Sequence, residues 1–315
     1  MGRVEQTART VNDPFLITGA TSGLGLATAK SLAHQGVPTL LGCRDTHRAV
    51  RAKQAILAEV PDASLDTIPL DLASIDSVRE ATARITARET RLAGIICNAG
   101  VQIVSGVETS ADGYEMTFAT NHLGHFQLVT ELVDRLGPGA RIIVVSSDVH
   151  QGPGKSGGFP APQWAPPAEL ADPAVQRQRA SSRDGRVRYA TSKLANVYFA
   201  YELADRLRPL GITVTAFDPG LIPETGLSRN YPTPLRQGYR LMAPLIRWLV
   251  PVARPLHRSA GDLAWLATAP ELAQTTRRYF TGRDELPSAA ESYDRERAGE
   301  LWEVSERLVR RARPA

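Results

Sequence analysis

The sequence predicts an α/β fold: a single Rossmann-type, doubly wound parallel sheet with helices on both faces. Two observations support this prediction. Short apolar runs of β-forming residues alternate along the chain with helical patterns, as they do in parallel sheets. Glycine-rich and polar segments come directly after these runs, at 18–25, 43–45, 98–100, 146–147 and 218–222. Because ligands of such sheets bind at the carboxyl ends of the strands, we expect a site along one edge.

The apolar runs mark the expected strands, and helices fill the gaps between them. We expect strands at 15–18, 38–42, 65–70, 94–97, 141–146 and 212–217. Helices are expected from the first glycine turn to Gln35, and over 49–60, 74–90 and 191–207. Since no internal repeat or second domain is visible, residues 1–315 are expected to form one domain.

Three stretches lie outside this alternation. The segment 151–188 is rich in glycine, proline and polar residues, which predicts a long insertion loop. The segment 228–259 mixes arginines with large apolar side chains, and we favour a lid that covers a pocket with its apolar face. The basic, amphipathic pattern at 236–258 is also compatible with peripheral contact with an anionic membrane, so that alternative stays open. Residues 285–315 are expected to form a C-terminal helical tail.

The composition is that of an ordinary globular protein, with 43% hydrophobic and 22% charged residues. The net charge is +4, but the arginines are scattered among acids, so we expect no nucleic-acid partner. Cys43 and Cys97 lie in apolar segments without metal-ligand spacing, so we expect no metal site and a reducing, cytoplasmic location. No apolar run approaches the ~20 residues that span a bilayer.

A glycine-rich turn follows the first expected strand and opens the first helix. Gly19 permits the tight turn, Gly23 lets backbone approach a pyrophosphate, and Gly25 lets helix and strand pack closely. The N–H groups and the dipole of the helix then favour a bound phosphate. The candidate cofactor contacts in this turn are Gly19, Thr21, Ser22, Gly23, Leu24 and Gly25.

The residue after the second expected strand indicates which nicotinamide cofactor is bound. An acid there would hydrogen-bond the ribose 2′-hydroxyl of NAD and repel a 2′-phosphate. The chain has Arg44 near this position, and a guanidinium matches a phosphate with two parallel hydrogen bonds. NADP(H) is therefore the expected cofactor. Asp45 is interpreted as a helix-terminal or turn acid rather than a ribose ligand.

Tyr189 and Lys193 form the candidate catalytic pair. They are expected to open a helix, where a spacing of four places both side chains on one face. A free tyrosine titrates near ~10 and is a poor acid or base at neutral pH. A neighbouring ammonium favours the phenolate and brings the group closer to its working range.

In a set of short motifs, the chain resembles the short-chain dehydrogenase/reductase family. The motifs stand in the family's order between residues 14 and 282: Thr18 to Gly25, Asp71 and Leu72, Asn98 to Gly100, Asn121, Ser146 and Ser147, Tyr189 to Lys193, and Asp218 to Gly220. The resemblance implies one dinucleotide-binding catalytic domain.

The resemblance also implies a role for each of these residues. Tyr189 would be the general acid/base, and Lys193 would lower its pKa and hold the nicotinamide ribose. Ser147 would hydrogen-bond the substrate oxygen, and Asn121 would anchor a water in the proton relay. Asp71 and Leu72 would flank the adenine. The other implied cofactor contacts are Asn98, Ala99, Gly100, Tyr189, Lys193, Pro219, Gly220, Leu221, Ile222 and Thr225.

Within this family the chain resembles the branch of retinol dehydrogenases and protochlorophyllide reductases. The similarity lies in 43–45, 112–116, 121–126 and 301–309. Two cysteine positions and a tyrosine of the photoenzymes are absent, since Asp218-Pro219-Gly220 is followed by Leu221 and the helix 192–196 has no cysteine. We therefore do not expect a light-driven reductase. Glu224 stands where relatives carry a carboxamide-binding threonine, with Thr225 next to it.

The expected function is an NADP(H)-dependent oxidoreductase that moves a hydride between nicotinamide and a carbonyl or alcohol of a hydrophobic small molecule. Two alternatives stay open: a protochlorophyllide reductase-like enzyme acting on a C=C bond, and a non-catalytic NADP(H) sensor. The chain could act as a monomer or a homodimer. His122 and His125 are expected to pack within a helix rather than bind metal, and His150 is expected to cap local structure rather than border the substrate.

Overall fold

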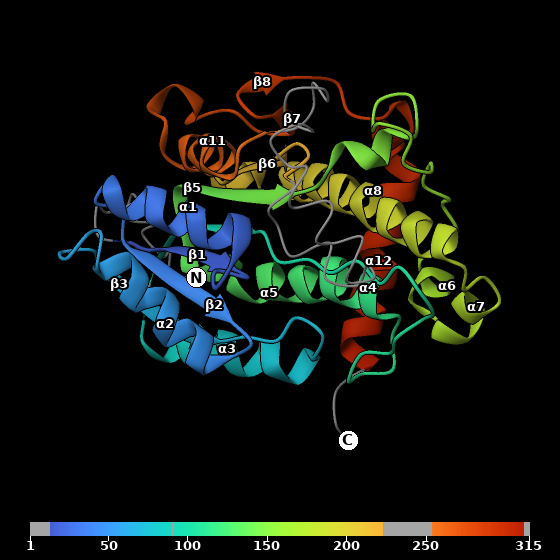
Figure 1. Ribbon diagram of the computed structural model, residues 1–315, viewed down its shortest axis with the longest axis horizontal. Coiled ribbons are helices and arrows are strands. Elements are labelled where there is room, and N and C mark those ends of the chain that lie inside the picture. The colour runs from blue at the N-terminus through green and yellow to red at the C-terminus, as the bar shows by residue number, and fades with distance from the viewer. Residues whose placement is uncertain (1–12, 90, 223–253, 312–315) are drawn as a thin grey trace, which may run out of the picture.

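The computed structural model describes residues 13–89, 91–222 and 254–311. Its strands form one eight-stranded sheet in the order β3-β2-β1-β4-β5-β6-β7-β8 (Figure 1). The strands are β1 (Phe15–Thr18), β2 (Thr39–Cys43), β3 (Leu65–Pro69), β4 (Leu92–Cys97), β5 (Leu136–Val145), β6 (Thr213–Asp218), β7 (Arg278–Thr281) and β8 (Asp284–Glu285). Neighbours from β3 to β7 pair in parallel, and only β8 runs antiparallel to its neighbour β7.

The expected Rossmann-type sheet is therefore confirmed. The ends of each expected strand lie within three residues of the observed ends, except that β5 begins earlier than expected, at Leu136. The central strands are buried along their whole length, as in β1, β4 and β6. Parallel strands covered on both faces read as continuous apolar runs, which is why the sequence pattern identifies them. The short strands β7 and β8 were not expected, because Arg278 and the acids of β8 interrupt any such run.

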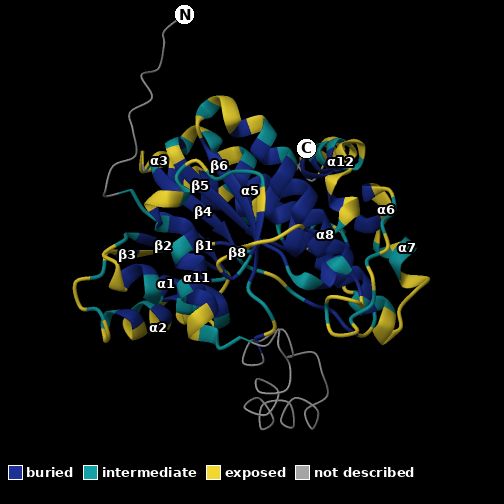
Figure 2. Cartoon of the chain, turned by 90° about the horizontal axis from the view of Figure 1, so that it is seen from above, coloured by how far each residue is buried: buried dark blue, intermediate teal, exposed yellow. Residues whose placement is uncertain are grey.

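Helices cover both faces of the sheet (Figure 2). On one face lie α1 (Gly23–His34), α2 (Thr46–Leu57) and α11 (Leu256–Thr268), which share one apolar core with the strands. On the other lie α3 (Ile75–Ala87), α5 (Gly124–Leu132) and α8 (Ser182–Leu207), with α12 (Arg295–Arg311) packed against α8. The shorter helices are α4 (Met116–Phe118), α6 (Pro167–Ala171), α7 (Pro173–Arg177), the π-helix Ala119–Leu123 and the 3-10 helices Val133–Arg135, Asp148–Gln151, Arg208–Leu210, Pro270–Leu272 and Ala290–Tyr293. None of the helices in the described ranges is long and apolar enough to cross a membrane.

The strand order reverses between β1 and β4. The chain builds β1, β2 and β3 outward in one direction, then crosses back so that β4 pairs with the other side of β1. The connections after β1 and β4 consequently lead to helices on opposite faces of the sheet, α1 on one face and α5 on the other. Such a switch point is where open α/β sheets bind their ligands.

The segment 151–188 is only partly a loop, which corrects the expectation from its composition. It contains α6 and α7, and its last residues belong to α8, which begins at Ser182 rather than at Tyr189. Ser181 and Asp184 form a reciprocal capping box at this start. Gly185 argues against a helix in the sequence, because glycine disfavours helix. The packing nevertheless requires glycine at this position, since a Cβ would lie 2.4 Å from the Val104 carbonyl oxygen. Close packing of α8 against the loop after β4 therefore selects a residue that ordinarily disfavours helix.

Most of the expected lid, 228–253, lies outside the described residues. Its last residues are helical: Leu256 to Ser259 form the first turn of α11, and the Ser259 hydroxyl donates to the Pro219 carbonyl at 2.7 Å. The C-terminal tail is helical over α12, which buries Leu301, Val304 and Leu308. Glu285 belongs instead to β8, because its backbone pairs with Phe280.

Candidate functional site

The carboxyl edge of the sheet gathers most of the expected site residues. Each of the strands β1 to β6 ends just before one of the segments singled out above: 19–25, Arg44, Asp71 and Leu72, 98–100, Ser147, and 219–222. In a parallel sheet these ends lie side by side, so segments far apart in sequence face one region. Glu224 and Thr225 lie outside the described residues.

The glycine-rich turn has a backbone shape that larger residues would not permit. Gly19 and Gly23 have φ of +67° and +54°, in the left-handed region that favours glycine. At Gly25 a Cβ would lie 2.5 Å from the Gly19 carbonyl oxygen and 2.6 Å from Asn98 Nδ2. The turn is therefore pressed against the loop after β4, and its backbone is left as the surface that a ligand would meet.

A buried hydrogen-bond network holds these two loops together, and the sequence did not reveal it. The Thr18 hydroxyl oxygen accepts from the backbone amides of Asn98 and Ala99, each at 2.9 Å, and Asn98 Nδ2 donates to the Thr18 carbonyl at 2.8 Å. The same hydroxyl lies 2.9 Å from His125 Nε2, while His125 Nδ1 lies 3.1 Å from the Asn121 carbonyl. Burial lowers the pKa of His125 to about 4, so the ring is neutral, donates from Nδ1 and accepts at Nε2.

Arg44 and Asp45 have different environments after β2. Arg44 is exposed, and its guanidinium forms no ion pair with the described residues. Asp45 is the N-cap of α2 and accepts from the Arg48 amide at 3.0 Å, which lowers the pKa of its carboxyl. The interpretation of Asp45 as a helix-terminal acid is confirmed, and among the described residues no acid pairs with Arg44 at this strand end.

Asp71 and Leu72, in the loop after β3, both make contacts within the protein. The Asp71 carboxylate accepts from the Ala73 amide at 3.0 Å, and its backbone amide donates to the Ser77 hydroxyl. Leu72 is buried below the start of α5, where a Cβ on Gly124 would lie 2.3 Å from the Leu72 carbonyl oxygen. These contacts fix the loop that the family resemblance assigns to the adenine.

Tyr189 and Lys193 lie together on α8. The Lys193 ammonium is 5.6 Å from the centre of the Tyr189 ring and donates to the Val145 carbonyl at 3.1 Å. Only 3% of Lys193 and 6% of Tyr189 are exposed. Burial lowers the pKa of Lys193 to about 8, and the charge of Asp218 opposes this shift. Phe159, from the segment before α8, packs edge-on against the Tyr189 ring at 6.1 Å between ring centres.

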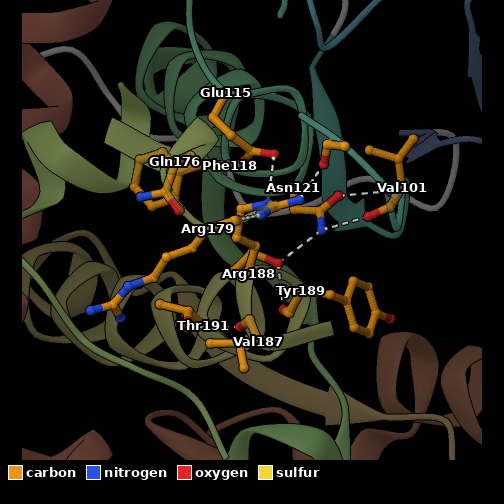
Figure 3. A network of polar contacts seen from close by, with 12 residues as sticks. Val101, Glu115, Phe118, Asn121, Gln176, Arg179, Val187, Arg188, Tyr189 and Thr191 are labelled. Carbon is orange, nitrogen blue, oxygen red and sulfur yellow. Dashed lines mark hydrogen bonds and ion pairs between the residues drawn. The ribbon is translucent and has the colours of Figure 1, made fainter. Parts of the chain in front are cut away.

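Asn121 lies in the π-helix between α4 and α5, a rare local form that is frequent at functional sites. Its side-chain oxygen accepts from the Val101 amide at 2.8 Å, and its Nδ2 donates to the Val101 carbonyl and to the Ser192 hydroxyl (Figure 3). The side chain therefore clamps the loop after β4 to α8, next to Tyr189.

The two serines after β5 have different surroundings. Ser146 is buried, and its hydroxyl donates to the Lys193 carbonyl at 2.8 Å. Ser147 is partly exposed; its hydroxyl donates to the Asp148 carboxylate at 3.0 Å and accepts from the Val149 amide at 3.4 Å. Val149 belongs to the same small apolar cluster as Tyr189, so the Ser147 turn adjoins the Tyr189 ring. Of the pair, Ser147 is the one available to a ligand.

His122 and His150 make structural contacts, as expected. His122 is fully buried among Phe118, Phe126 and Phe199, and its Nε2 lies 2.8 Å from the Ser305 hydroxyl of α12. His150 Nδ1 contacts the Ser147 carbonyl, and its Nε2 accepts from the Ala289 amide at 3.1 Å. His150 thereby ties the turn that carries Ser147 to the chain after β8.

A second buried network supports the start of α8. The Arg188 guanidinium donates to the carbonyls of Arg179 and Gly106, and its Nε lies 3.6 Å from Glu115 Oε1 (Figure 3). Glu115 also accepts from the Phe118 amide at 2.7 Å. Figure 3 shows the phenol of Tyr189 pointing away from this network. The arginine before Tyr189 thus anchors the helix, a role that no local sequence signal indicates because its partners are distant in the chain.

Comparisons with known proteins agree with this architecture. Residues 14–158 match the family model described as short chain dehydrogenase. Human retinol dehydrogenase 13 is 36% identical over 298 residues, covering 93% of this chain and 83% of that protein. Protochlorophyllide reductase B from Hordeum vulgare is 33% identical over 329 residues, covering 97% of this chain and 80% of that protein.

One solved structure, an uncharacterised protein from Mycobacterium paratuberculosis, superimposes with a TM-score of 0.68 at 24% identity, covering 95% of this chain and 93% of that one. At this identity the likeness concerns the fold alone. The identity to retinol dehydrogenase 13 and protochlorophyllide reductase B, over most of each chain, shows the family: the protein belongs to the short-chain dehydrogenases/reductases, in the branch of retinol dehydrogenases and protochlorophyllide reductases.

Proposed function

We propose that the protein is an NADP(H)-dependent oxidoreductase that transfers a hydride between nicotinamide and a carbonyl or alcohol of a hydrophobic small molecule. The observation that carries the proposal is the position of the Lys193 ammonium, 5.6 Å from the centre of the Tyr189 ring, which itself adjoins the Ser147 turn. A buried cation next to a phenol, with a partly exposed hydroxyl nearby, is suited to moving a proton onto or off a carbonyl oxygen. Residues 1–315 would act as one dinucleotide-binding catalytic domain.

The residues at the carboxyl edge fit an NADP(H) molecule. The backbone of 19–25, with the start of α1 behind it, would hold the pyrophosphate, and Arg44 would pair with the 2′-phosphate. Asp71, Leu72 and 98–100 would line the adenosine half, while Lys193 and 219–222, with Thr225, would face the nicotinamide half. When bound, this cofactor would supply or accept the hydride.

The chain's own residues would handle the proton and the substrate oxygen. In the reductive direction Tyr189 would donate its phenolic proton to the carbonyl oxygen. Ser147 would hydrogen-bond the same oxygen and hold it near Tyr189. Lys193 would stabilise the phenolate that Tyr189 becomes. Asn121 would hold the loop after β4 against α8 through its hydrogen bonds to Val101 and Ser192.

The walls of the site favour an apolar substrate. Phe159 and Val149 pack around Tyr189, and Leu221 is 37% exposed at the end of β6. The names of the two relatives, a retinol dehydrogenase and a protochlorophyllide reductase, refer to large hydrophobic molecules. We propose a substrate of this kind, and a cytoplasmic location in keeping with the free, buried thiols of Cys43 and Cys97.

A second candidate is reduction of a C=C bond, as in protochlorophyllide reductase. The 33% identity to the barley enzyme over most of both chains favours it. The serine, tyrosine and lysine would serve either reaction, but Leu221 replaces the cysteine expected of the photoenzymes. Turnover in darkness separates the two candidates, because a light-driven reductase needs illumination.

The test is a screen of purified protein with NADPH against retinal, other hydrophobic ketones and aldehydes, and protochlorophyllide, each in darkness and in light. Loss of NADPH absorbance is followed, and products are identified by chromatography. We expect reduction of a carbonyl compound in darkness. Light-dependent turnover of protochlorophyllide alone would favour the second candidate, and NADPH binding without turnover of any compound would favour a sensor.

A further inference from the structure

We propose that Asp148 is a positioning residue whose carboxyl group sets whether the Ser147 hydroxyl can donate to the substrate oxygen. The proposal rests on the proposed function, because it assigns Ser147 to that oxygen. It follows from one contact: Ser147 Oγ donates to Asp148 Oδ1 at 3.0 Å. Asp148 itself takes no part in the transfer of the hydride or of the Tyr189 proton.

A serine hydroxyl has one proton to donate. An ionised carboxylate only accepts, so while Asp148 is charged it holds the proton that Ser147 would offer to a substrate oxygen. A protonated carboxyl group can instead donate to Ser147 Oγ. The serine proton is then free for the substrate, and Ser147 Oγ still accepts from the Val149 amide. The protonation state of Asp148 therefore decides the direction of the Ser147 hydrogen bond.

A second carboxylate lies next to Asp148. Asp218, at the end of β6, is buried, and its carboxylate accepts from the Gly220 amide at 2.9 Å and from the Thr281 hydroxyl at 3.3 Å. It is also hydrogen-bonded by the backbone amide of Asp148. This arrangement places two acids within one small region beside Ser147, where two negative charges repel each other.

The other ionisable groups around these two acids lie on β7, on the turn of Asp148, on α8 and just before α11. Tyr279 of β7 faces both acids and is held neutral, since burial and their charges raise its pKa. His150 is held neutral on the turn of Asp148, because burial lowers its pKa to about 4. The cations Lys193 of α8 and Arg254 act on Asp218. Asp148 has no ion pair of its own with a described cation.

Burial, and then the charge of Asp218, raise the pKa of Asp148 from 3.8 to about 6. As pH falls through this value Asp148 gains a proton and Ser147 becomes free to donate, so carbonyl reduction gains a contribution from Ser147. As pH rises through it, that contribution is lost. We expect a change of about tenfold in kcat/KM, which is below the ~10²–10³ that a dedicated oxyanion donor contributes.

Two variants isolate this effect from other titrations. Asp148→Asn and Asp148→Leu have no carboxyl group at this position that could ionise. Their kcat/KM is divided by that of the wild type at each pH, with a carbonyl substrate from the screen. This ratio should be flat at acid pH and rise about tenfold toward pH ~8, because only the wild type loses the Ser147 contribution. Asp112→Asn is the matched control: burial raises the pKa of Asp112 too, but its carboxylate accepts from the Ile75 amide. Its ratio should not change with pH. A constant ratio for both Asp148 variants would overturn the proposal, because a merely structural role moves activity equally at every pH.

A titration without substrate separates failure of this proposal from failure of the proposed function. Carboxyl ¹³C NMR should show an aspartate signal that titrates near 6 and disappears in Asp148→Asn. Ser147→Ala should raise its midpoint, because the hydroxyl stabilises the ionised carboxylate. A midpoint near the ordinary 3.8, or one unmoved by Ser147→Ala, would overturn the positioning role even if carbonyl reduction is found. If no carbonyl is reduced but these shifts are seen, the Ser147–Asp148 coupling stands and the proposed function fails.

Discussion

The hydroxyl of Thr18, at the end of β1, lies 2.9 Å from His125 Nε2 across the switch point of the sheet. Because it also accepts from the amides that open the loop after β4, one buried oxygen joins β1, β4 and α5. The shape of the carboxyl edge between β1 and β4, where we propose that the cofactor binds, therefore depends on this hydroxyl.

Replacing this hydroxyl by a methyl group should loosen the edge. Thr18→Val keeps the volume but leaves the Asn98 and Ala99 amides buried without their partner, which should cost at least about 2 kcal/mol of unfolding free energy and weaken NADPH binding. Thr28→Val is the control: Thr28 is also fully buried, but its hydroxyl has no hydrogen-bond partner in the described structure. Urea unfolding should show little change for Thr28→Val. Equal losses in the two variants would contradict the network.

His122 predicts a specific acid sensitivity. Burial lowers its pKa from 6.5 to about 3, so the folded protein binds this proton less readily than the unfolded chain. The stability that a neutral His122 contributes is thus fully present above pH 6.5 and falls as pH drops below it, by about 1.4 kcal/mol per pH unit. In His122→Gln, which keeps a donor for Ser305 but does not titrate, this slope should be absent. Unfolding curves measured between pH ~7 and ~5 that shift in parallel for wild type and variant would contradict the prediction.

The glycine turn predicts a contrast between two substitutions. Gly25→Ala places a Cβ 2.5 Å from the Gly19 carbonyl oxygen, so the turn must open and NADPH binding should weaken by more than about tenfold. Gly261→Ala in α11 meets no atom within 4 Å and should raise stability by about 0.5–1 kcal/mol through helix propensity. Fluorescence titration with NADPH and thermal unfolding measure both. Unchanged NADPH affinity in Gly25→Ala would argue against a cofactor at this turn.

The preference for NADPH over NADH tests the proposed role of Arg44. A charge-assisted pair with the 2′-phosphate contributes about 1.5–3 kcal/mol, so Arg44→Ala should weaken NADPH by roughly 10- to 150-fold and leave NADH nearly unchanged. Arg48→Ala is the matched control, since Arg48 is also exposed but pairs with Asp45. Comparison of kcat/KM for both cofactors decides the matter. A wild-type preference for NADH, or an Arg44→Ala variant with normal NADPH efficiency, would contradict the assignment.

Sequence patterns predicted the sheet well because its central strands are buried on both faces and therefore uniformly apolar. They also identified segments that gather at the carboxyl edge, since 19–25, 98–100 and Ser147 directly follow strands. They failed where tertiary contacts override local preference. Gly185 suggests a loop, yet it lies inside α8 because Val104 leaves no room for a side chain.

Other parts of the site depend on partners that are distant in the chain. The bond between Thr18 and His125 joins residues 107 apart, and Arg188 meets the Gly106 carbonyl 82 positions away. The pairing of Asp148 with Asp218 likewise becomes visible only when β5 and β6 lie side by side. No periodicity or local motif encodes such contacts.

The most direct test of the account is Tyr189→Phe, assayed with NADPH and a carbonyl substrate from the screen. The ring can still pack against Phe159, but no phenolic proton can move, so turnover should fall by more than about 10²-fold while NADPH affinity stays near that of the wild type. Tyr198→Phe, on the same helix, removes a hydroxyl that donates to the Glu291 carbonyl and should keep its activity. Loss of turnover confined to Tyr189→Phe is the predicted result; retention of more than a few per cent of wild-type turnover would remove Tyr189 from the chemistry.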